Sequence, residues 1–246
     1  MVIIPESLIN RLQEADSVVF FTGAGISAES GIPTFRGKDG IWNKLKPEEL
    51  ANFNAFLRNP EMVWEWYSHR KQIIHESRPN NAHKAISEMQ DLFREVTVIT
   101  QNIDNFHRRA GSRTIYELHG NIERNYCIEC KTFYNDELPV EGKIPKCTNC
   151  GGLIRPDIVW FGEYLPQDQF QASEKAAKDC DVFFVVGTSA VVYPAASLIY
   201  IARDNGAYII EVNIEETEIS YLADKSFYGE AGKVLPAIRE ELIKNK

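Results

Sequence analysis

Four cysteines in two closely spaced pairs could bind a metal ion. Cys127 and Cys130 are separated by two residues, as are Cys147 and Cys150, and 16 residues lie between the pairs. This is the spacing of a four-thiolate zinc site. Four thiolates complete the tetrahedron around zinc and leave no open position for water, so we expect a structural ion. Two disulfides are the alternative, but we expect no oxidising compartment for this chain. The fifth cysteine, Cys180, is expected to be a small buried or half-buried residue without a chemical role.

A glycine-rich turn near the N-terminus could bind phosphate. Residues 17–22 form an apolar run of strand length, and Gly23, Gly25 and Ala28 then fit the G-x-G-x-x-G/A pattern. Small residues in such a turn let backbone N–H groups approach a pyrophosphate at a helix N-terminus. A turn that only reverses the chain is the alternative, because this pattern alone is weak evidence.

The sequence after this turn departs from an ordinary dinucleotide-binding fold. An acidic residue that holds the ribose should end a second strand about 20 residues on, where this chain has Lys38 and Asp39 in a loop. Pro33 also stops any long crossover helix. We therefore expect the turn to open into a loop that lines a ligand. The side chains that it offers are those of Ser27, Phe35 and Arg36.

Polar clusters follow the other predicted buried strands. Continuous apolar runs over residues 95–100, 182–186 and 207–213 are typical of parallel strands that are buried on both faces. Ligands of such sheets bind at the carboxyl ends of the strands. The polar residues at these ends are Gln101, Asn102 and Asp104, then Gly187, Thr188 and Ser189, then Asn213 and Glu215. For Asn102 and Asp104 alone, helix capping is the simpler explanation.

His119 is the candidate for proton transfer. It follows a short predicted strand and precedes Gly120, which gives access to its side chain. Histidine is the side chain best suited to accept a proton near neutral pH, although a lone histidine is more often structural. His83 and His107 are expected to be surface or helix-packing residues.

Helical patterns alternate with the buried strands, which predicts an α/β fold with a doubly wound parallel sheet. The predicted helices cover residues 8–15, 81–93, 167–178, 194–205 and 233–244. Two stretches interrupt the alternation, because residues 42–78 are helical and rich in aromatic residues and residues 127–150 contain the cysteine pairs. We expect these insertions to form a smaller domain at the edge of the sheet.

Composition limits the classes of partner. The chain has 246 residues, 44% of them hydrophobic, which is enough for one large core and a small additional domain. A net charge of −8 argues against general binding to nucleic acid or to an anionic membrane, because both need a basic surface. The sequence has no signal-peptide pattern, and its longest apolar runs are too short to span a bilayer. We therefore expect a soluble cytoplasmic protein.

From about residue 12 to residue 232 the chain resembles the sirtuin family of NAD-dependent protein-lysine deacylases. The motifs that carry the resemblance occur in one fixed order: residues 23–27, 34–36, 100–104 and 118–120, the four cysteines, and residues 187–189. The resemblance implies a Rossmann-like large domain, approximately residues 1–36, 79–121 and 156–246. It also implies a small domain made of a helical module, residues 37–78, and a zinc module, residues 122–155. The active site would lie in the cleft between them.

The resemblance also implies roles for the residues that match the motifs. NAD would be a co-substrate, with its diphosphate at Ala24 and Gly25, its nicotinamide carboxamide at Asn102 and Asp104, and the adjoining ribose at Gln101. The other cofactor contacts would come from Gly23, Ser27, Phe35, Arg36, Gly187, Thr188, Ser189, Asn213, Glu215 and Ala231.

The implied reaction consumes NAD and an acyl-lysine protein or peptide. The acyl-amide oxygen displaces nicotinamide from the ribose C1′, and His119 then accepts a proton from a ribose hydroxyl that attacks the resulting imidate. The acyl group leaves as O-acyl-ADP-ribose. The segment with Val159, Phe161, Gly162 and Glu163 resembles the extended strand that pairs with the substrate backbone.

Tyr67 and Arg70 bear on which acyl group is removed. They are three residues apart in a predicted helix and so share a face. A guanidinium beside a phenol can bind a carboxylate through charge-assisted hydrogen bonds. The pair resembles the Tyr-x-x-Arg pair of sirtuins that accept succinyl-lysine and malonyl-lysine. The alternative is an amphipathic helix in which Tyr67 packs and Arg70 is solvated.

Three other functions are alternatives. A mono-ADP-ribosyltransferase would attach ADP-ribose to protein when nicotinamide leaves. An NAD oxidoreductase would need the acidic ribose anchor that the sequence lacks. A zinc-ribbon protein that binds nucleic acid would need basic surface, whereas residues 127–150 contain three lysines against four acidic residues.

Overall fold

Two β-sheets organise the part of the chain that the computed structural model describes, which is residues 2–36, 40–43, 46–135, 137–138 and 144–245. The larger sheet has six strands in the order β3-β2-β1-β7-β8-β9, and every neighbouring pair is parallel. This is the doubly wound strand order 3-2-1-4-5-6, so the predicted fold class is confirmed. The strands are β1 (Ser17–Thr22), β2 (Glu95–Thr100), β3 (Thr114–Glu117), β7 (Val182–Val186), β8 (Tyr208–Asn213) and β9 (Lys225–Tyr228).

The central strands form where the sequence has continuous runs of β-branched and aromatic residues. Five of the six residues of β1 and all of β7 are buried, as expected for strands covered on both faces. Phe20 of β1 stacks on Phe184 of β7 with ring centroids 4.6 Å apart. Aromatic packing therefore helps to hold the two central strands β1 and β7 side by side.

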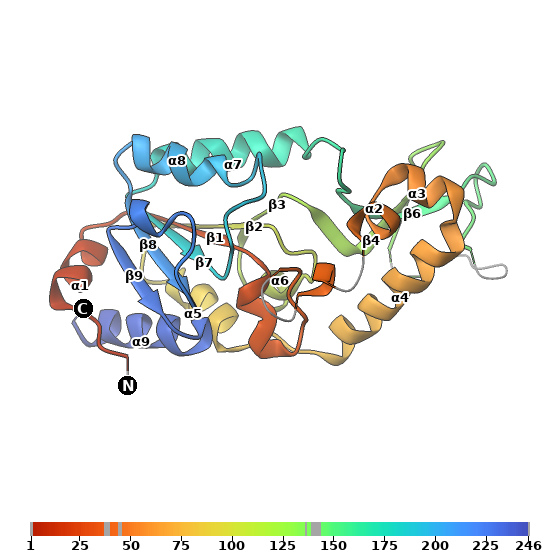
Figure 1. Cartoon of the computed structure of the whole chain (residues 1–246). Helices are drawn as coiled ribbons and strands as arrows, with labels where there is room; N and C mark the ends of the chain where they lie inside the picture. The colour runs from red at the N-terminus through yellow and green to blue at the C-terminus, as the bar shows by residue number, and fades with distance from the viewer. Residues whose placement is uncertain (1, 37–39, 44–45, 136, 139–143, 246) are drawn as a thin grey trace.

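Helices cover both faces of this sheet (Figure 1). One face carries α1 (Glu6–Gln13), α5 (Asn81–Met89) and α9 (Ala231–Lys244), which share one apolar core with β1 and β7. The other face carries α7 (Gln167–Asp179) and α8 (Ser197–Asp204), whose core includes Cys180, 6% exposed. The five predicted helices are confirmed, and so is the burial of Cys180.

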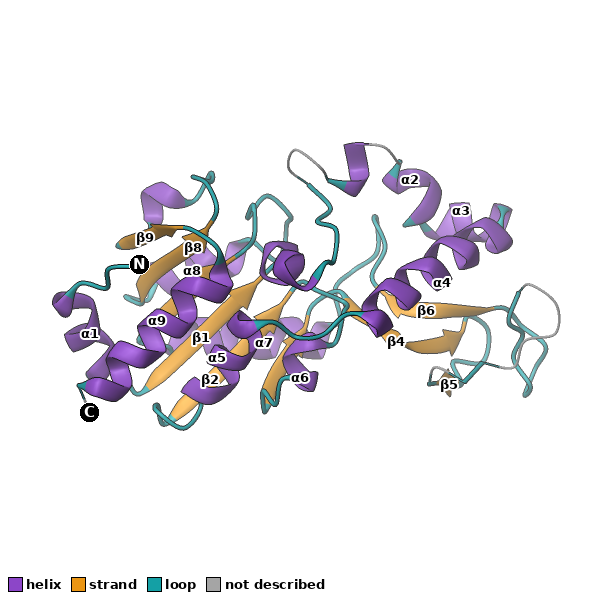
Figure 2. Cartoon of the chain, turned by 90° about the horizontal axis from the view of Figure 1, so that it is seen from below, coloured by secondary structure: helices purple, strands orange, loops and turns teal. Residues whose placement is uncertain are grey.

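A second group of elements lies beyond the carboxyl ends of the large sheet's strands (Figure 2). It contains the three-stranded antiparallel sheet β5-β4-β6 and the helices α2, α3 and α4. The sheet, α3 and α4 share a core that includes Trp160 and Phe56. The indole Nε1 of Trp64 donates to the Ile154 carbonyl over 2.9 Å and joins the two inserted stretches. The bounds are α2 (Pro47–Leu50), α3 (Phe53–Arg58), α4 (Pro60–Glu76), β4 (Gly120–Cys127), β5 (Phe133–Tyr134) and β6 (Ile154–Ile158).

The segment after β1 differs in one respect from the sequence-based expectation. A short 3₁₀ helix, Ala24–Ser30, follows the strand directly. Gly31 ends it with φ at +84°, a left-handed conformation that favours glycine, so the helix stops before Pro33 is reached. Lys38 and Asp39, where the sequence lacks the acidic anchor, lie outside the described residues. None of the described helices combines the length and apolar character that a bilayer span requires.

Candidate active site

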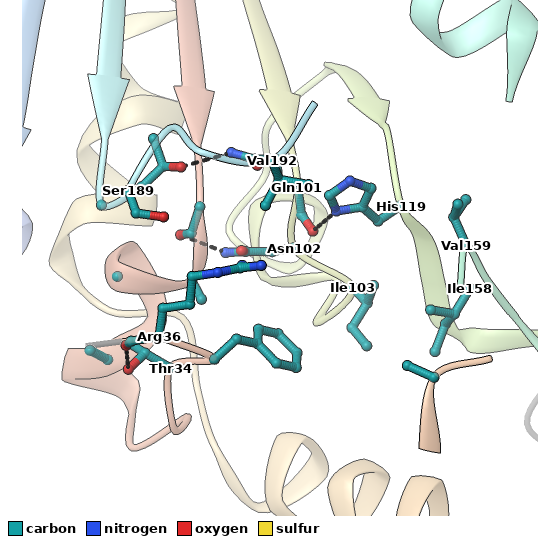
Figure 3. Close-up of a pocket in the computed structure, with 18 of the residues that line it drawn as sticks. Thr34, Arg36, Gln101, Asn102, Ile103, His119, Ile158, Val159, Ser189 and Val192 are labelled. Carbon is teal, nitrogen blue, oxygen red and sulfur yellow. Dashed lines mark hydrogen bonds between the residues drawn. The ribbon is translucent and has the colours of Figure 1, made fainter. Parts of the chain in front are cut away.

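A cavity of about 690 Å³ opens at the carboxyl ends of the strands, between the large sheet and the small one. Its walls include every residue predicted for the site except Ser27, Asp104 and Arg70. The predicted residues that line it are Gly23, Ala24, Gly25, Phe35, Arg36, Tyr67, Gln101, Asn102, His119, Val159, Phe161, Gly162, Glu163, Gly187, Thr188, Ser189, Asn213, Glu215 and Ala231. The structure thus brings together side chains and loops from both parts of the molecule (Figure 3).

The loops after β1 and β7 touch through their backbones at one end of this cavity. The Gly25 N–H donates to the Gly187 carbonyl over 2.7 Å, and the Gly23 N–H donates to the Val186 carbonyl over 3.0 Å. A Cβ atom on Gly25 would lie 2.7 Å from the same Gly187 oxygen, which no real side chain tolerates. The glycine pattern is therefore required by the contact between the two loops. This contact lies at the point where the strand order reverses, where doubly wound sheets bind nucleotides.

The loop after β2 is tied to both of these loops. The side-chain amide of Asn102 donates to the Gly23 carbonyl over 3.1 Å, and that of Gln101 donates to the Thr188 hydroxyl over 3.0 Å. The Asn102 N–H also donates to the Thr100 hydroxyl. In Figure 3 the Arg36 side chain extends toward the same loop. Three strand ends thus form one polar wall of the cavity.

Ser27 and Asp104 lie behind this wall. The Ser27 hydroxyl donates to Asp104 Oδ2 over 2.7 Å, and the Phe106 N–H donates to Asp104 Oδ1 over 3.0 Å. Burial raises the pKa of the Asp104 carboxyl. Because the Ser27 hydrogen is used for Asp104, its oxygen can accept from the Asn102 amide, 3.3 Å away. These two residues support Asn102 from behind.

His83 belongs to the same buried network and packs against the rings of Phe106 and His107, so the helix-packing expectation for it is confirmed and the surface one is wrong. His83 Nδ1 lies 3.3 Å from the Asn80 backbone N–H and 3.1 Å from Asn80 Oδ1, and its Nε2 lies 3.4 Å from the Ser27 oxygen. Burial lowers the pKa of His83 well below its ordinary value, which keeps the ring neutral. Asn80 three residues before His83, at the start of a helix, is the capping-box pattern that could have revealed this role.

His107 is also buried and not at the surface. Its Nε2 lies 2.9 Å from the Thr22 hydroxyl, which donates in turn to the Thr100 hydroxyl over 2.9 Å. Burial lowers the pKa of His107 to about 3. The ring therefore links α6 (Phe106–Arg109) to the ends of β1 and β2 as a neutral residue.

His119 stands at the junction of the two parts of the cavity, between β3 and β4. Its Nδ1 lies 3.0 Å from the Gln101 carbonyl oxygen. Burial lowers its pKa, the Gln101 carbonyl opposes this, and the Arg36 cation lowers the pKa further. Gly120 follows at φ +79°, and a Cβ there would lie 2.0 Å from the Asp157 carbonyl. The ring is therefore neutral near pH 7 and is held by a backbone that requires glycine beside it.

The helix α4 brings Tyr67 and Arg70 to one buried face. Tyr67 lines the cavity, and its hydroxyl accepts from the indole Nε1 of Trp160 over 2.7 Å. Arg70 is 5% exposed and lies behind Phe35, with its guanidinium carbon 4.7 Å from that ring centroid and 5.4 Å from the Trp66 centroid. Among the described residues no carboxylate lies within ion-pair distance of Arg70, and its Nε has no hydrogen-bond partner. Burial lowers its pKa.

The segment after β6 forms the opposite rim. The Val159 N–H donates to the His119 carbonyl over 3.0 Å, and the Phe161 N–H donates to the Ala51 carbonyl over 2.9 Å. Within the described residues, the Val159 carbonyl and the Gly162 N–H have no hydrogen-bond partner. The Glu163 side chain turns away from the rim to the guanidinium of Arg155.

The four predicted zinc ligands come together at the far end of the small sheet. The sulfur atoms of Cys127, Cys130, Cys147 and Cys150 all lie within 4.8 Å of one another. The Cys127–Cys150 and Cys130–Cys147 pairs are each 3.5 Å apart. Four sulfurs at about 2.3 Å from a tetrahedral zinc ion would be about 3.8 Å apart, so the cluster fits a structural zinc ion.

Comparison with known proteins places this geometry in a family. The model of the Sir2 family matches residues 23–194. A protein of Aquifex aeolicus (strain VF5) named NAD-dependent protein deacylase is 52% identical over 227 residues, covering 92% of this chain and 95% of that protein.

Solved structures give the same result. A Sir2 homologue in complex with NAD is 45% identical, superposes with a TM-score of 0.93, and covers 99% of this chain and 95% of its own. A Sir2 protein solved with a p53 peptide and NAD is 33% identical, with a TM-score of 0.87 over 97% of this chain and 98% of its own. This chain therefore belongs to the Sir2 family.

Proposed function

We propose that this chain uses NAD to remove acyl groups from lysines of proteins, with His119 as the general base. The predicted class of enzyme, an NAD-dependent protein deacylase, is confirmed by the names and complexes of its relatives. The proposed chemistry rests on one observation. Neutral His119 lies in the cavity between the glycine-rich loop after β1 and the segment after β6. A dinucleotide and an extended peptide can both reach it in the cavity.

NAD would lie along the loops that end β1, β2, β7 and β8. Its diphosphate would be held by the backbone of Ala24 and Gly25, and its nicotinamide carboxamide by Asn102. Asp104 would act on the carboxamide through the buried hydrogen bonds that fix Asn102, since it does not line the cavity. The remaining contacts would come from Gly23, Phe35, Arg36, Gln101, Gly187, Thr188, Ser189, Asn213, Glu215 and Ala231.

The substrate would enter from the small-sheet side. We assign residues 1–36, 79–121 and 156–246 to a cofactor domain and residues 37–78 and 122–155 to a small domain. The unpaired Val159 carbonyl and Gly162 N–H can bond to an extended peptide as a further strand. Such pairing uses the main chain, so we expect broad tolerance for the sequence around the lysine.

The reaction follows from these positions. The acyl-amide oxygen of the substrate attacks C1′ of the ribose, and nicotinamide leaves. His119 Nε2 accepts the proton of a ribose hydroxyl as that oxygen attacks the imidate carbon. The lysine amine would then leave with a proton, and water would add to the remaining cyclic acyloxonium to give O-acyl-ADP-ribose. Zinc, bound by Cys127, Cys130, Cys147 and Cys150, would take no part in these steps because its four ligands leave no open position.

Acyl groups that end in a carboxylate would be substrates together with acetyl groups. Arg70 is a buried cation with no carboxylate within ion-pair distance among the described residues, and it lies against the rings of Phe35 and Trp66, which both line the cavity. Buried charges are normally paired. A small displacement of Phe35 when substrate binds would let a succinyl or malonyl carboxylate reach Arg70 beside the Tyr67 hydroxyl.

The proposed activity is tested by incubating the protein with NAD and an acetylated lysine peptide and identifying products by mass spectrometry. Nicotinamide, O-acetyl-ADP-ribose and the free-lysine peptide should form together, and only when acylated peptide is present. ADP-ribose attached to protein would favour the transferase alternative. Reduced cofactor, detected by its absorbance, would favour an oxidoreductase.

A further inference from the structure

The guanidinium of Arg155 and the carboxylate of Glu163 form a bidentate ion pair next to the segment after β6, which forms one rim of the cavity. Arg155 is 1% exposed and lies in β6. Its Nη1 donates to Glu163 Oε1 over 2.5 Å, and its Nη2 donates to Glu163 Oε2 over 2.9 Å. Paired parallel bonds of this type fix the relative orientation of both groups.

The same two side chains also hold the backbone between them. Arg155 Nη2 donates to the Ile158 carbonyl over 2.7 Å, while Glu163 Oε2 accepts from the Trp160 N–H over 2.8 Å. The Arg155 guanidinium carbon lies 3.5 Å from the centroid of the Trp160 ring. The ion pair thus contacts the segment at its beginning, its middle and its end.

This segment continues the free edge of a sheet. β6 pairs with β4 on one side only, because it is the last strand in the order β5-β4-β6. After Ile158 the Val159 N–H bonds to the His119 carbonyl and the Phe161 N–H bonds to the Ala51 carbonyl, and the chain then turns at Gly162 with φ at +87°. A Cβ at Gly162 would meet nothing within 4 Å, and the neighbouring Phe161 carbonyl accepts from the Asn52 side-chain amide over 3.4 Å. The bonds from Arg155 and Glu163 to Ile158 and Trp160 add to these contacts in fixing the shape of the segment.

We propose that Arg155 and Glu163 position the strand edge that the substrate peptide joins. The inference rests on the proposed function and assigns Glu163 a task different from direct contact with substrate. The pair occupies the Ile158 carbonyl and the Trp160 N–H, whereas the Val159 carbonyl and the Gly162 N–H have no partner among the described residues and are free to bond to an added strand. Both are positioning residues, because neither is required to touch the reacting atoms.

An ion pair is suited to this task and is not explained by stability alone. Replacing a buried ion pair by apolar residues of similar volume is often neutral or stabilising, whereas removing one partner is costly. The charged pair adds direction, because a guanidinium fork and a carboxylate bond in one plane only. Apolar replacements would fill the space without fixing the backbone.

The test separates positioning from stability with two variants. Arg155→Met leaves the Glu163 carboxylate without its partner, and the double variant Arg155→Met with Glu163→Met removes both charges. The matched control is Arg113→Met, which removes an exposed ion pair with Asp91. For each protein we would measure the melting temperature, the Kd for NAD without peptide, kcat, and KM for two substrates. One substrate is an acyl-lysine peptide, and the other is a capped acyl-lysine without flanking residues.

Both Arg155 variants should raise KM for the peptide by about tenfold or more, the effect of about 1.4 kcal/mol. The KM for capped acyl-lysine, which makes no strand pairing, and the Kd for NAD should stay within about twofold. The double variant should regain the melting temperature of the wild type and keep the raised peptide KM. Recovery of peptide KM together with stability would overturn the proposal, as would an equal loss for both substrates. Absence of turnover by the wild-type protein would instead contradict the proposed function.

Discussion

His119 Nδ1 lies 3.0 Å from the carbonyl oxygen of Gln101. A carbonyl oxygen can only accept, so Nδ1 carries the hydrogen and Nε2 of the neutral ring keeps a free lone pair. The same loop continues into Asn102, whose amide bonds to Gly23 of the phosphate-type turn. The proposed base is therefore fixed in tautomer and in position relative to the proposed nicotinamide wall.

The pH dependence of turnover follows from this environment. Burial, the largest influence, lowers the pKa of His119, and Arg36 adds to this effect. The neutral ring is the active form, so activity should be lost as the pH falls through the lowered pKa. We expect kcat/KM to be constant around pH 7 and to decline only below the ordinary histidine pKa of about 6.5. An acid limb centred above that value in a pH–rate profile would contradict the assignment.

Replacement of His119 by alanine should lower kcat by at least the 10²–10⁴-fold typical of a lost general base, to about the background of the assay. The fold and the zinc content should be unchanged, since the side chain lines a cavity. His69→Ala is the control, because His69 is exposed on the same molecule. Turnover close to the wild-type rate in folded His119→Ala protein would remove the proposed mechanism.

Gly25→Ala should reduce the free energy of NAD binding by more than it reduces the free energy of unfolding. The added Cβ would lie 2.7 Å from the Gly187 oxygen, so the two loops must separate. We expect the Kd for NAD, measured by calorimetry, to rise by about tenfold or more, equivalent to about 1.4 kcal/mol. Gly206→Asn is the control, since its left-handed turn has open space and asparagine tolerates that conformation. Equal NAD affinities in both variants would show that the loop contact is not needed for binding.

The protein should contain one zinc ion, and its removal should destabilise the small domain. Thiolate–zinc binding free energy is part of the folding free energy, so Cys127→Ser should lower both zinc content and melting temperature. Cys180→Ser is the control, because Cys180 lies in the core beneath α7 and α8. Metal analysis of active purified protein that detects no zinc would contradict the assignment.

The large sheet was predictable because its central strands are buried on both faces. β1, β2 and β7 have the residue ranges expected from their apolar runs. β9 was not predicted, since only one of its four residues is buried and its sequence, Lys-Ser-Phe-Tyr, has no apolar run. An edge strand of this kind forms because it pairs with β8, and the local sequence carries no signal of that pairing.

The sequence allowed the loops of the site to be predicted, but not the directions in which their side chains point. Motifs identified the turns that carry Ser27 and Asp104, yet the structure turns both away from the cavity toward each other. His83 joins them from α5, a helix distant in sequence. Glu163 likewise bonds to Arg155 in place of facing outward. Such contacts arise from tertiary packing, so residue spacing alone could not reveal them.

The prediction with the most at stake concerns Arg70. If its buried guanidinium binds the carboxylate at the end of the acyl group, removing the guanidinium leaves that carboxylate buried without a partner. This costs several kcal/mol of transition-state binding. Arg70→Met should therefore lower kcat/KM for a succinyl-lysine peptide by about 10²-fold or more. For the acetyl-lysine peptide the change should be small or favourable, because methionine leaves an apolar lining.

Tyr67→Phe should shift the ratio of the two kcat/KM values in the same direction but more weakly, because one neutral hydrogen bond is lost. In the wild-type protein the indole Nε1 of Trp160 donates to the Tyr67 hydroxyl. The variant leaves this donor without its partner, so part of the effect will fall on both substrates. Arg113→Met, at an exposed ion pair, is the control for loss of a positive charge. The succinyl-to-acetyl ratio isolates recognition from packing, because damage to the helix lowers both numbers together. An Arg70→Met protein with an unchanged ratio would show that this buried cation serves only the packing of α4 against Phe35.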